Sequence, residues 1–301
     1  MTPKSRDEYA TATDGMPARR SGAWARDKLS FFDEFLPPAL QATKDKVHRH
    51  YVDLFAGPGR NIDDEGAEFD GGAVRALKAR AQSSPDVRFT HAHLVNLDRI
   101  AHDALRQRVD ARCEDGSCAI PASAVQFDND DANLLVGAIM RRIHKRAYAF
   151  IFADIEAPNQ LPYDTVRALK FHGHESVDFC VLFPQGMALQ RMLPMRRDKL
   201  APTIEALNRY FGTDAWLELY DQRKTDAQSP ELYRGIQKLY EDQLRKAGWM
   251  YAKEIRNVKR RGDAALYKIL LATDKDVALR LASWSVEKER DRKGPELELG
   301  L

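Results

Sequence analysis

The sequence predicts an α/β fold with a mostly parallel central sheet, helices on both faces, a C-terminal β-hairpin and a helical insertion after the fifth strand. Two observations support this. Between His50 and Phe183, five short apolar runs alternate with segments of helical periodicity. Such alternation requires crossover connections, which place helices on both faces of a parallel sheet. After Phe183 the pattern becomes helical and then ends in two strand-like runs.

The elements follow one another in a regular order. Apolar residues from Trp24 to Leu36 share one helical face, and Pro37-Pro38 predicts the end of that helix. Five strands are expected at His50–Phe55, His91–Leu97, Ser123–Phe127, Tyr148–Ala153 and Val177–Phe183. The helices between them are expected at Gly72–Ala81, Ile100–Val109, Leu134–Lys145 and Tyr163–Phe171.

The C-terminal part predicts a hairpin. Met250–Val258 and Ala265–Thr273 are strand-like and are separated by the basic turn Lys259–Asp263. A helix at Val277–Trp284 ends the fold.

The length of 301 residues fits one large domain carrying an insertion. We expect a single domain over residues 23–286, with the helical insertion at about 187–247. The aromatic residues of that insertion are expected to form a small core. The polar ends, 1–22 and 287–301, are expected to be flexible tails.

Composition predicts a soluble cytoplasmic protein. Hydrophobic residues make up 44% and charged residues 31% of the chain, which is typical of globular proteins. The sequence lacks an apolar run near the roughly 20 residues that span a bilayer, and residues 1–20 lack the apolar core of a signal peptide. Three cysteines do not predict a disulfide framework. No membrane contact is expected, and the oligomeric state stays open.

The net charge of +2 predicts no strong attraction to a charged partner, but basic residues cluster locally. Most such clusters are solvated faces. Two of them lie where substrate contacts are expected, and there they would bind nucleic-acid phosphates without sequence specificity. These candidate substrate residues are Arg191, Arg196, Arg197, Lys259, Arg260 and Arg261.

Polar residues follow the first three predicted strands, at the edge where parallel sheets bind ligands. The turn after the first strand contains Gly57 and Gly59, which let backbone approach a ligand, and Asp53 beside them can reach an ammonium group. Asp98 is placed to accept hydrogen bonds from ribose hydroxyls, and Asp128 or Asn129 from the amine of adenine. The candidate cofactor residues are Asp53, Phe55, Ala56, Gly57, Pro58, Gly59, Asp98, Asp128 and Asn129.

The identity of the ligand follows from what the glycine turn lacks. Asn61-Ile62 stands where pyrophosphate binding requires a third glycine and a helix start. An adenosyl ligand with an amino-acid tail fits better, so the predicted cofactor is S-adenosylmethionine. Helix capping is the alternative interpretation for Asp98 and Asp131.

The fourth strand ends at Asp154-Ile-Glu156-Ala-Pro158, so the candidate catalytic residues are Asp154 and Glu156. Asp154 can orient an acceptor and Glu156 can act as a base.

The chain resembles the three-Cys-motif partner protein (TcmP) family. The resemblance rests mainly on Asp53-Leu-Phe-Ala-Gly-Pro-Gly59, with looser matches at Gly71–Leu77, Asp128–Asn133, Leu161–Thr165 and Phe183–Gly186. It implies a Rossmann-like methyltransferase fold and a three-Cys-motif radical-S-adenosylmethionine-like protein as a partner.

The fourth strand departs from that family's pattern. Related proteins commonly place proline directly after the acid, whereas Ile155 stands here, and no aromatic ring follows at once to stack a flipped base. This departure counts against transfer to a nucleobase amine. The leading hypothesis, which follows from the resemblance, is a TcmP-like methyltransferase acting on nucleic acid (RNA or DNA) or on a partner protein. Two alternatives are a non-catalytic partner of the three-Cys-motif protein, and a nucleic-acid-processing component whose acids Asp53, Asp154 and Glu156 bind Mg²⁺.

Three His-x-His pairs occur, at His48/His50, His91/His93 and His172/His174. Each pair offers two metal ligands where four are usual, so no metal site is predicted.

Overall fold

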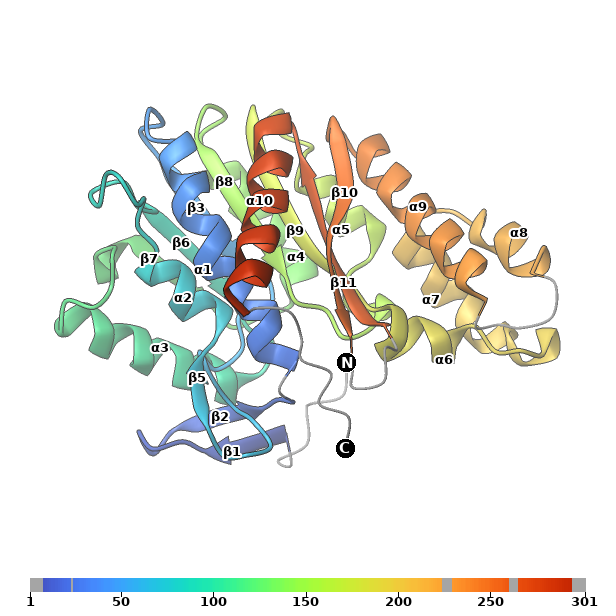
Figure 1. Cartoon of the computed structure of the whole chain (residues 1–301), viewed down its shortest axis with the longest axis horizontal. Coiled ribbons are helices and arrows are strands. Elements are labelled where there is room, and N and C mark those ends of the chain that lie inside the picture. Colours follow the sequence, from blue (N-terminus) through green and yellow to red (C-terminus); the bar gives the residue numbers. More distant parts are fainter. Residues whose placement is uncertain (1–7, 23, 224–228, 260–264, 294–301) are drawn as a thin grey trace.

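The structure is a computed structural model that describes residues 8–22, 24–223, 229–259 and 265–293. Its main sheet has seven strands in the order β10-β11-β9-β8-β3-β6-β7 (Figure 1). The bounds are β3 Arg49–Asp53, β6 His91–Val95, β7 Val125–Asp128, β8 Tyr148–Ala153, β9 Ser176–Phe183, β10 Tyr251–Lys259 and β11 Ala265–Thr273.

The direction of these strands confirms the predicted fold class. β7, β6, β3, β8 and β9 pair in parallel, and β11 pairs antiparallel with both β9 and β10. This is the strand order of the Rossmann-like methyltransferase fold, with the C-terminal hairpin at one edge. The chain leaves β3 toward β6 and β7 and returns on its other side as β8, so the topological switch point lies between β3 and β8.

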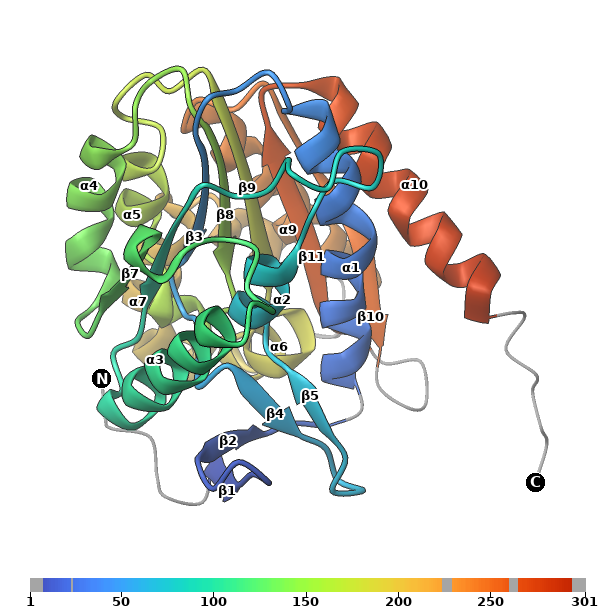
Figure 2. The ribbon, with the colours of Figure 1, turned by 90° about the vertical axis from the view of Figure 1, so that its left-hand side faces the viewer.

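Helices cover both faces of the sheet (Figures 1 and 2). One face carries α1 (Trp24–Ala42), α2 (Gly72–Lys78), α3 (Arg99–Glu114) and α10 (Asp276–Lys293). The other carries α4 (Ala132–Arg142) and α5 (Tyr163–Ala168), which pack with the insertion. The buried strands divide accordingly: Tyr51 packs on the α1 side, and its neighbour Val52 on the α4 side.

The first helix is longer than predicted. α1 continues through Pro37 and Pro38 to Ala42. Phe35 before the prolines and Leu40 after them are both fully buried. The expectation that Pro37-Pro38 ends the helix was therefore wrong, because burial of its apolar face on both sides offsets the backbone hydrogen bonds that proline removes.

The insertion after β9 is helical, as expected. It contains α6 (Gln190–Met192), α7 (Ala201–Phe211), α8 (Trp216–Asp221) and α9 (Pro230–Lys246). Its aromatic residues are buried, as expected. They do not form a separate small core, because they pack in one cluster with Phe183 and the other buried residues of this face of the main sheet. The aromatic residues are Tyr210, Phe211, Trp216, Tyr220, Tyr233 and Tyr240.

A second, four-stranded sheet was not anticipated. Its order is β1-β2-β4-β5, with β1 Tyr9–Thr11, β2 Pro17–Arg20, β4 Arg60–Ile62 and β5 Glu68–Asp70. The prediction of a flexible tail over residues 1–22 was thus wrong for residues 9–20. These strands are too short to show apolar alternation, and ionic contacts hold them. The predicted tail 287–301 was wrong for residues 287–293, which belong to α10.

Among the described residues, the helices include none that is long and apolar enough to cross a membrane.

Four histidines lie close together where β3 and β6 begin: His48, His50, His91 and His93. His50 and His91 are register partners with rings stacked at 4.6 Å between centroids, and His50 Nδ1 lies 3.4 Å from His93 Nε2. Burial lowers the pKa of His50 to about 3 and that of His93 to about 4. Both rings are therefore neutral in the folded protein at neutral pH.

We expect His93→Gln to flatten the pH dependence of stability below pH 6.5. The unfolded chain takes up a proton at position 93 below about pH 6.5 and the folded one does not, so this contribution is full above pH 6.5 and is lost as the pH falls toward 4. The loss amounts to up to about 3 kcal/mol. Urea unfolding of both proteins from pH 7 to pH 4.5 measures it.

Only the difference between the two proteins isolates His93. Burial raises the pKa of Asp53 to about 7 and of Asp178 to about 6, and these acids act in the opposite sense over the same range. Parallel stability curves for wild type and His93→Gln would contradict the neutral state of His93.

Candidate functional site

A cavity of about 460 Å³ lies at the carboxyl ends of β3, β6 and β8, next to the topological switch point. Four parts of the chain line it: the turn after β3, the residues after β6, the start of α4 and the residues after β8. The second sheet adds Tyr9 and Arg19 as a further wall. The volume lies in the range of small-molecule sites.

The turn after β3 brings backbone to the cavity. Gly57 has a φ of +64°, and a Cβ there would meet nothing within 4 Å. The Gly57 N–H donates to Asn96 Oδ1 at 2.7 Å, and Asn96 Nδ2 donates to the Gly57 carbonyl at 3.0 Å. This pair of bonds fixes the turn. The space beside Gly57 is open, and a side chain at this position would fill it, so we call this space the glycine cradle.

Asp53 has a different role from the one predicted. Its side chain is buried, accepts hydrogen bonds from the Tyr51 hydroxyl at 2.7 Å and the Phe55 N–H at 3.2 Å, and does not line the cavity. The prediction of a direct contact with a ligand ammonium is not supported by this geometry. Asp53 instead stabilises the start of the turn by accepting the hydrogen bond from the Phe55 N–H.

Asp98 lines the cavity and is also a helix cap. Its Oδ1 accepts from the Ile100 N–H at 2.8 Å at the start of α3, and its Oδ2 accepts from the Tyr9 hydroxyl at 2.7 Å. The capping interpretation of Asp98 is thus confirmed. Its side chain also lines the cavity, and its role in ribose recognition stays a prediction.

The predicted adenine contacts are not among the residues that line the cavity. Asn129 Nδ2 donates to the carbonyl of Asn96 at 2.8 Å, and neither Asp128 nor Asn129 lines the cavity. Asp131 and Ala132 line it in their place, and Asp131 caps α4 by accepting from the Asn133 N–H. The loop after β7 thus reaches the cavity through Asp131 and Ala132, and contact of Asp128 or Asn129 with adenine stays a prediction.

Both candidate catalytic acids line the cavity, and each has a cationic partner. Asp154 Oδ2 lies 2.5 Å from the Nζ of Lys28, a buried residue of α1. Glu156 pairs with Arg19 of β2, and its backbone N–H donates to Gln160 Oε1 at 2.5 Å. Burial lowers the pKa of Lys28, although Asp154 opposes that shift.

The structure brings together some of the predicted residues. Those lining the cavity are Phe55, Gly57, Pro58, Asp98, Asp154 and Glu156. The cavity lining does not include the others of the cofactor set, which are Asp53, Ala56, Gly59, Asp128 and Asn129.

Of the predicted basic contacts, those among the described residues do not line the cavity. Arg196 and Arg197 are exposed and pair with Asp198 and Asp221 at 2.7 and 2.9 Å, and Arg191 is exposed. Lys259 ends β10 outside the cavity lining, and Arg260 and Arg261 lie outside the described residues.

Sequence reasoning missed Tyr9, Arg19, Lys28 and Asn96. Asn96 follows β6 directly, so the strand-end argument that selected Asp98 also applies to it. Tyr9 and Arg19 stand in a stretch without periodicity, and Lys28 belongs to a helix before the first main strand. Nothing local in the sequence marks these three.

Within the described residues, His, Cys, Asp and Glu side chains form no group of three or more that could hold a metal ion. Asp53, Asp154 and Glu156 are each engaged by other side chains, so no observation favours the magnesium hypothesis.

No protein-family model and no curated protein matches the chain. Among solved structures it is similar to the protein LPL1258 from Legionella pneumophila, at 10% identity and a TM-score of 0.49, covering 89% of this chain and 92% of that one. It is also similar to the N-terminal domain of human METTL16 in complex with SAH, at 8% identity and a TM-score of 0.39, covering 89% and 88%. Similarity this distant carries no argument about ligand or activity.

Proposed function

We propose that this chain is an S-adenosylmethionine-dependent methyltransferase. One observation carries the proposal: in a methyltransferase-type sheet, the cavity at the carboxyl ends of β3, β6 and β8 joins an open glycine cradle to an acid placed for ribose recognition. The cradle at Gly57 admits close approach of a ligand, and Asp98 stands on the next strand end.

The charge of the wall supports a cationic ligand over a phosphate-bearing one. Four carboxylates line the cavity, those of Asp98, Asp131, Asp154 and Glu156. Lys28 and Arg19 neutralise Asp154 and Glu156, and Arg99 pairs with Asp103, so Asp98 and Asp131 carry the excess negative charge. A pyrophosphate in this space would be repelled by the carboxylates, whereas a sulfonium cation is attracted.

The residues present fit the cofactor and divide the work between them. When bound, S-adenosylmethionine supplies an electrophilic methyl group. Gly57 and Pro58 hold the ligand by close backbone approach, Asp98 accepts hydrogen bonds from the ribose side, and Asp154 faces the acceptor. Methyl transfer needs the acceptor held in line with the methyl carbon, so positioning supplies much of the rate.

The acceptor belongs to the finer part of the proposal. The resemblance to the TcmP family supports a nucleic acid or a partner protein as acceptor, and the three-Cys-motif protein as a partner. In this role Asp154 orients the acceptor through a carboxylate held in place by Lys28. Glu156 must leave Arg19 before it can accept a proton.

A second candidate function is a ligand-binding partner protein without catalysis. The observation favouring it is that Lys28 and Arg19 neutralise the two acids at the acceptor side. Paired carboxylates are weak bases, so such a pocket can bind a cofactor without turning it over.

Transfer of label from methyl-tritiated S-adenosylmethionine separates the two functions. The purified chain is incubated with total RNA, with genomic DNA and with the purified three-Cys-motif protein. We expect label in one of these acceptors, and a loss of about a hundredfold in rate for Asp154→Asn. Asp164→Asn, at an exposed acid outside this cavity, is the matched control and should retain the rate.

The outcomes discriminate clearly. Cofactor binding without label in any acceptor supports the non-catalytic partner. An unchanged rate in Asp154→Asn would remove Asp154 from the acceptor site.

A further inference from the structure

Strands β1 and β2 form an N-terminal hairpin, and one face of this hairpin lines the cavity. Tyr9 and Arg19 are directly opposite each other in this antiparallel pair, so their side chains project from the same face. Both line the cavity. Tyr9 reaches Asp98 beyond β6, and Arg19 reaches Glu156 beyond β8, so the hairpin spans the site from the ribose side to the acceptor side.

The hairpin and the glycine turn form one hydrogen-bonded unit. β2 pairs in parallel with β4, with Arg19 opposite Asn61, and β4 begins directly after Gly59. The Ser21 hydroxyl donates to Asn61 Oδ1 at 3.0 Å in a buried contact. The hairpin and the segment that follows the glycine turn are therefore joined by backbone pairing.

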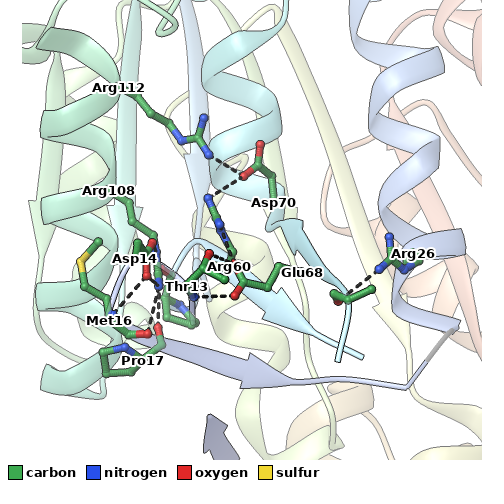
Figure 3. A network of polar contacts seen from close by, with 12 residues as sticks. Thr13, Asp14, Met16, Pro17, Arg26, Arg60, Glu68, Asp70, Arg108 and Arg112 are labelled. Carbon is green, nitrogen blue, oxygen red and sulfur yellow. Dashed lines mark hydrogen bonds and ion pairs between the residues drawn. The ribbon is translucent and has the colours of Figure 1, made fainter. Parts of the chain in front are cut away.

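Polar contacts fix the tip of the hairpin, as Figure 3 shows. Arg108 of α3 donates to Asp14 and to the carbonyls of Met16 and Pro17, and also to the carbonyl of Pro58 in the glycine turn. Thr13 donates to the carboxylate of Glu68 on β5. Arg108 thus links the tip of the hairpin to Pro58, a residue that lines the cavity.

We propose that the β1–β2 hairpin is the outer wall of the adenosyl site and that Tyr9 is a positioning residue, which holds the Asp98 carboxylate for the ribose of the adenosyl ligand. This inference rests on the proposed function. The Tyr9 hydroxyl occupies one lone pair of Asp98 Oδ2, and a carboxylate oxygen accepts a second hydrogen bond, so a ribose hydroxyl can bind beside it. Because Tyr9 already fixes the carboxylate, the ligand does not have to immobilise that side chain on binding.

The chemistry of the phenol agrees with this role. Burial and the neighbouring Asp98 raise the pKa of Tyr9, so its hydroxyl remains a protonated donor throughout the physiological range. A deprotonated phenol would repel Asp98 and open this side of the wall.

The test is calorimetric titration of the full chain with S-adenosylhomocysteine. Tyr9→Phe keeps the ring and removes the hydroxyl, and we expect affinity about threefold to tenfold weaker, as for the loss of one hydrogen bond. Tyr9→Ala removes the wall as well and should lose more than about tenfold. Thr11→Ala, at an exposed residue of the same strand outside the cavity, is the control and should bind like wild type.

Hydrogen exchange supplies a second readout that does not depend on affinity. Saturating S-adenosylhomocysteine should slow amide exchange across residues 9–20 in wild type. Unchanged or tighter binding by Tyr9→Phe, or hairpin exchange unaffected by bound ligand, would overturn the inference while leaving the proposed function intact. Absence of any binding by wild type, which is titrated first, would instead remove the proposed function.

Discussion

Replacement of Gly59 by alanine is expected to lower the free energy of unfolding by about 2–4 kcal/mol. Gly59 has a φ of +80°, which L-residues with a side chain rarely adopt. A Cβ there would also stand 2.8 Å from Leu105 Cδ1 and 3.2 Å from Val74 Cγ2, so the packing of α3 and α2 behind the turn would have to yield. Urea unfolding monitored by circular dichroism measures the change.

Gly57→Ala is the matched variant two residues away, and it should show the opposite division of effects. Gly57 has a similar φ of +64°, but its Cβ would meet open space beside the cavity. We expect a stability loss of only about 1 kcal/mol, and a loss of more than about tenfold in affinity for S-adenosylhomocysteine. A Gly59→Ala protein as stable as wild type, or a Gly57→Ala protein with unchanged affinity, would contradict this assignment of the two glycines.

Arg108→Met is expected to cost about 3 kcal/mol of stability and to release the hairpin from the glycine turn. The Arg108 side chain is almost fully buried and donates to the Asp14 carboxylate and to three carbonyls, whose partners the substitution would remove. Hydrogen bonds from Arg108 also hold the pKa of Asp14 below its usual range, so Asp14 is ionised at neutral pH. The substitution therefore leaves the Asp14 carboxylate without its cationic partner. Unfolding in urea gives the energy, and hydrogen exchange over residues 9–20 reports the release.

Arg106→Met provides the control on the same helix. Arg106 is exposed and lies 3.9 Å from Asp110, a geometry that contributes little to stability. We therefore expect Arg108→Met to lower the free energy of unfolding much more than Arg106→Met does. Equal stability of Arg108→Met and Arg106→Met, with hairpin exchange unchanged, would show that the hairpin is held by other contacts.

The sequence predicts the main sheet well because strands buried on both faces consist mainly of apolar residues. Strands such as Tyr148–Ala153 and Ser176–Phe183 are buried at every residue, so they stand out as apolar runs. Topology then places strand ends together, and for this reason the sequence predicts that Gly57, Asp98 and Asp154 lie at one edge of the sheet, where all three line the cavity.

The errors arise where contacts between distant segments decide the structure. The Tyr9–Asp98 bond joins residues 89 apart and the Lys28–Asp154 pair residues 126 apart, and neither has a local signal. The strands of the second sheet have three or four residues, which is too short for periodicity to appear. In the loop after β7, the strand-end argument does not determine which side chain faces the cavity. It selects Asp128, whereas Asp131 lines the cavity.

Calorimetric titration of the wild-type chain with S-adenosylmethionine and S-adenosylhomocysteine tests the central claim most directly. The account predicts one site with a dissociation constant in the micromolar range, about −8 kcal/mol, and weakened binding in Gly57→Ala. No heat of binding from either ligand at about 1 mM, where even sites of about −4 kcal/mol begin to fill, would contradict the adenosyl site itself.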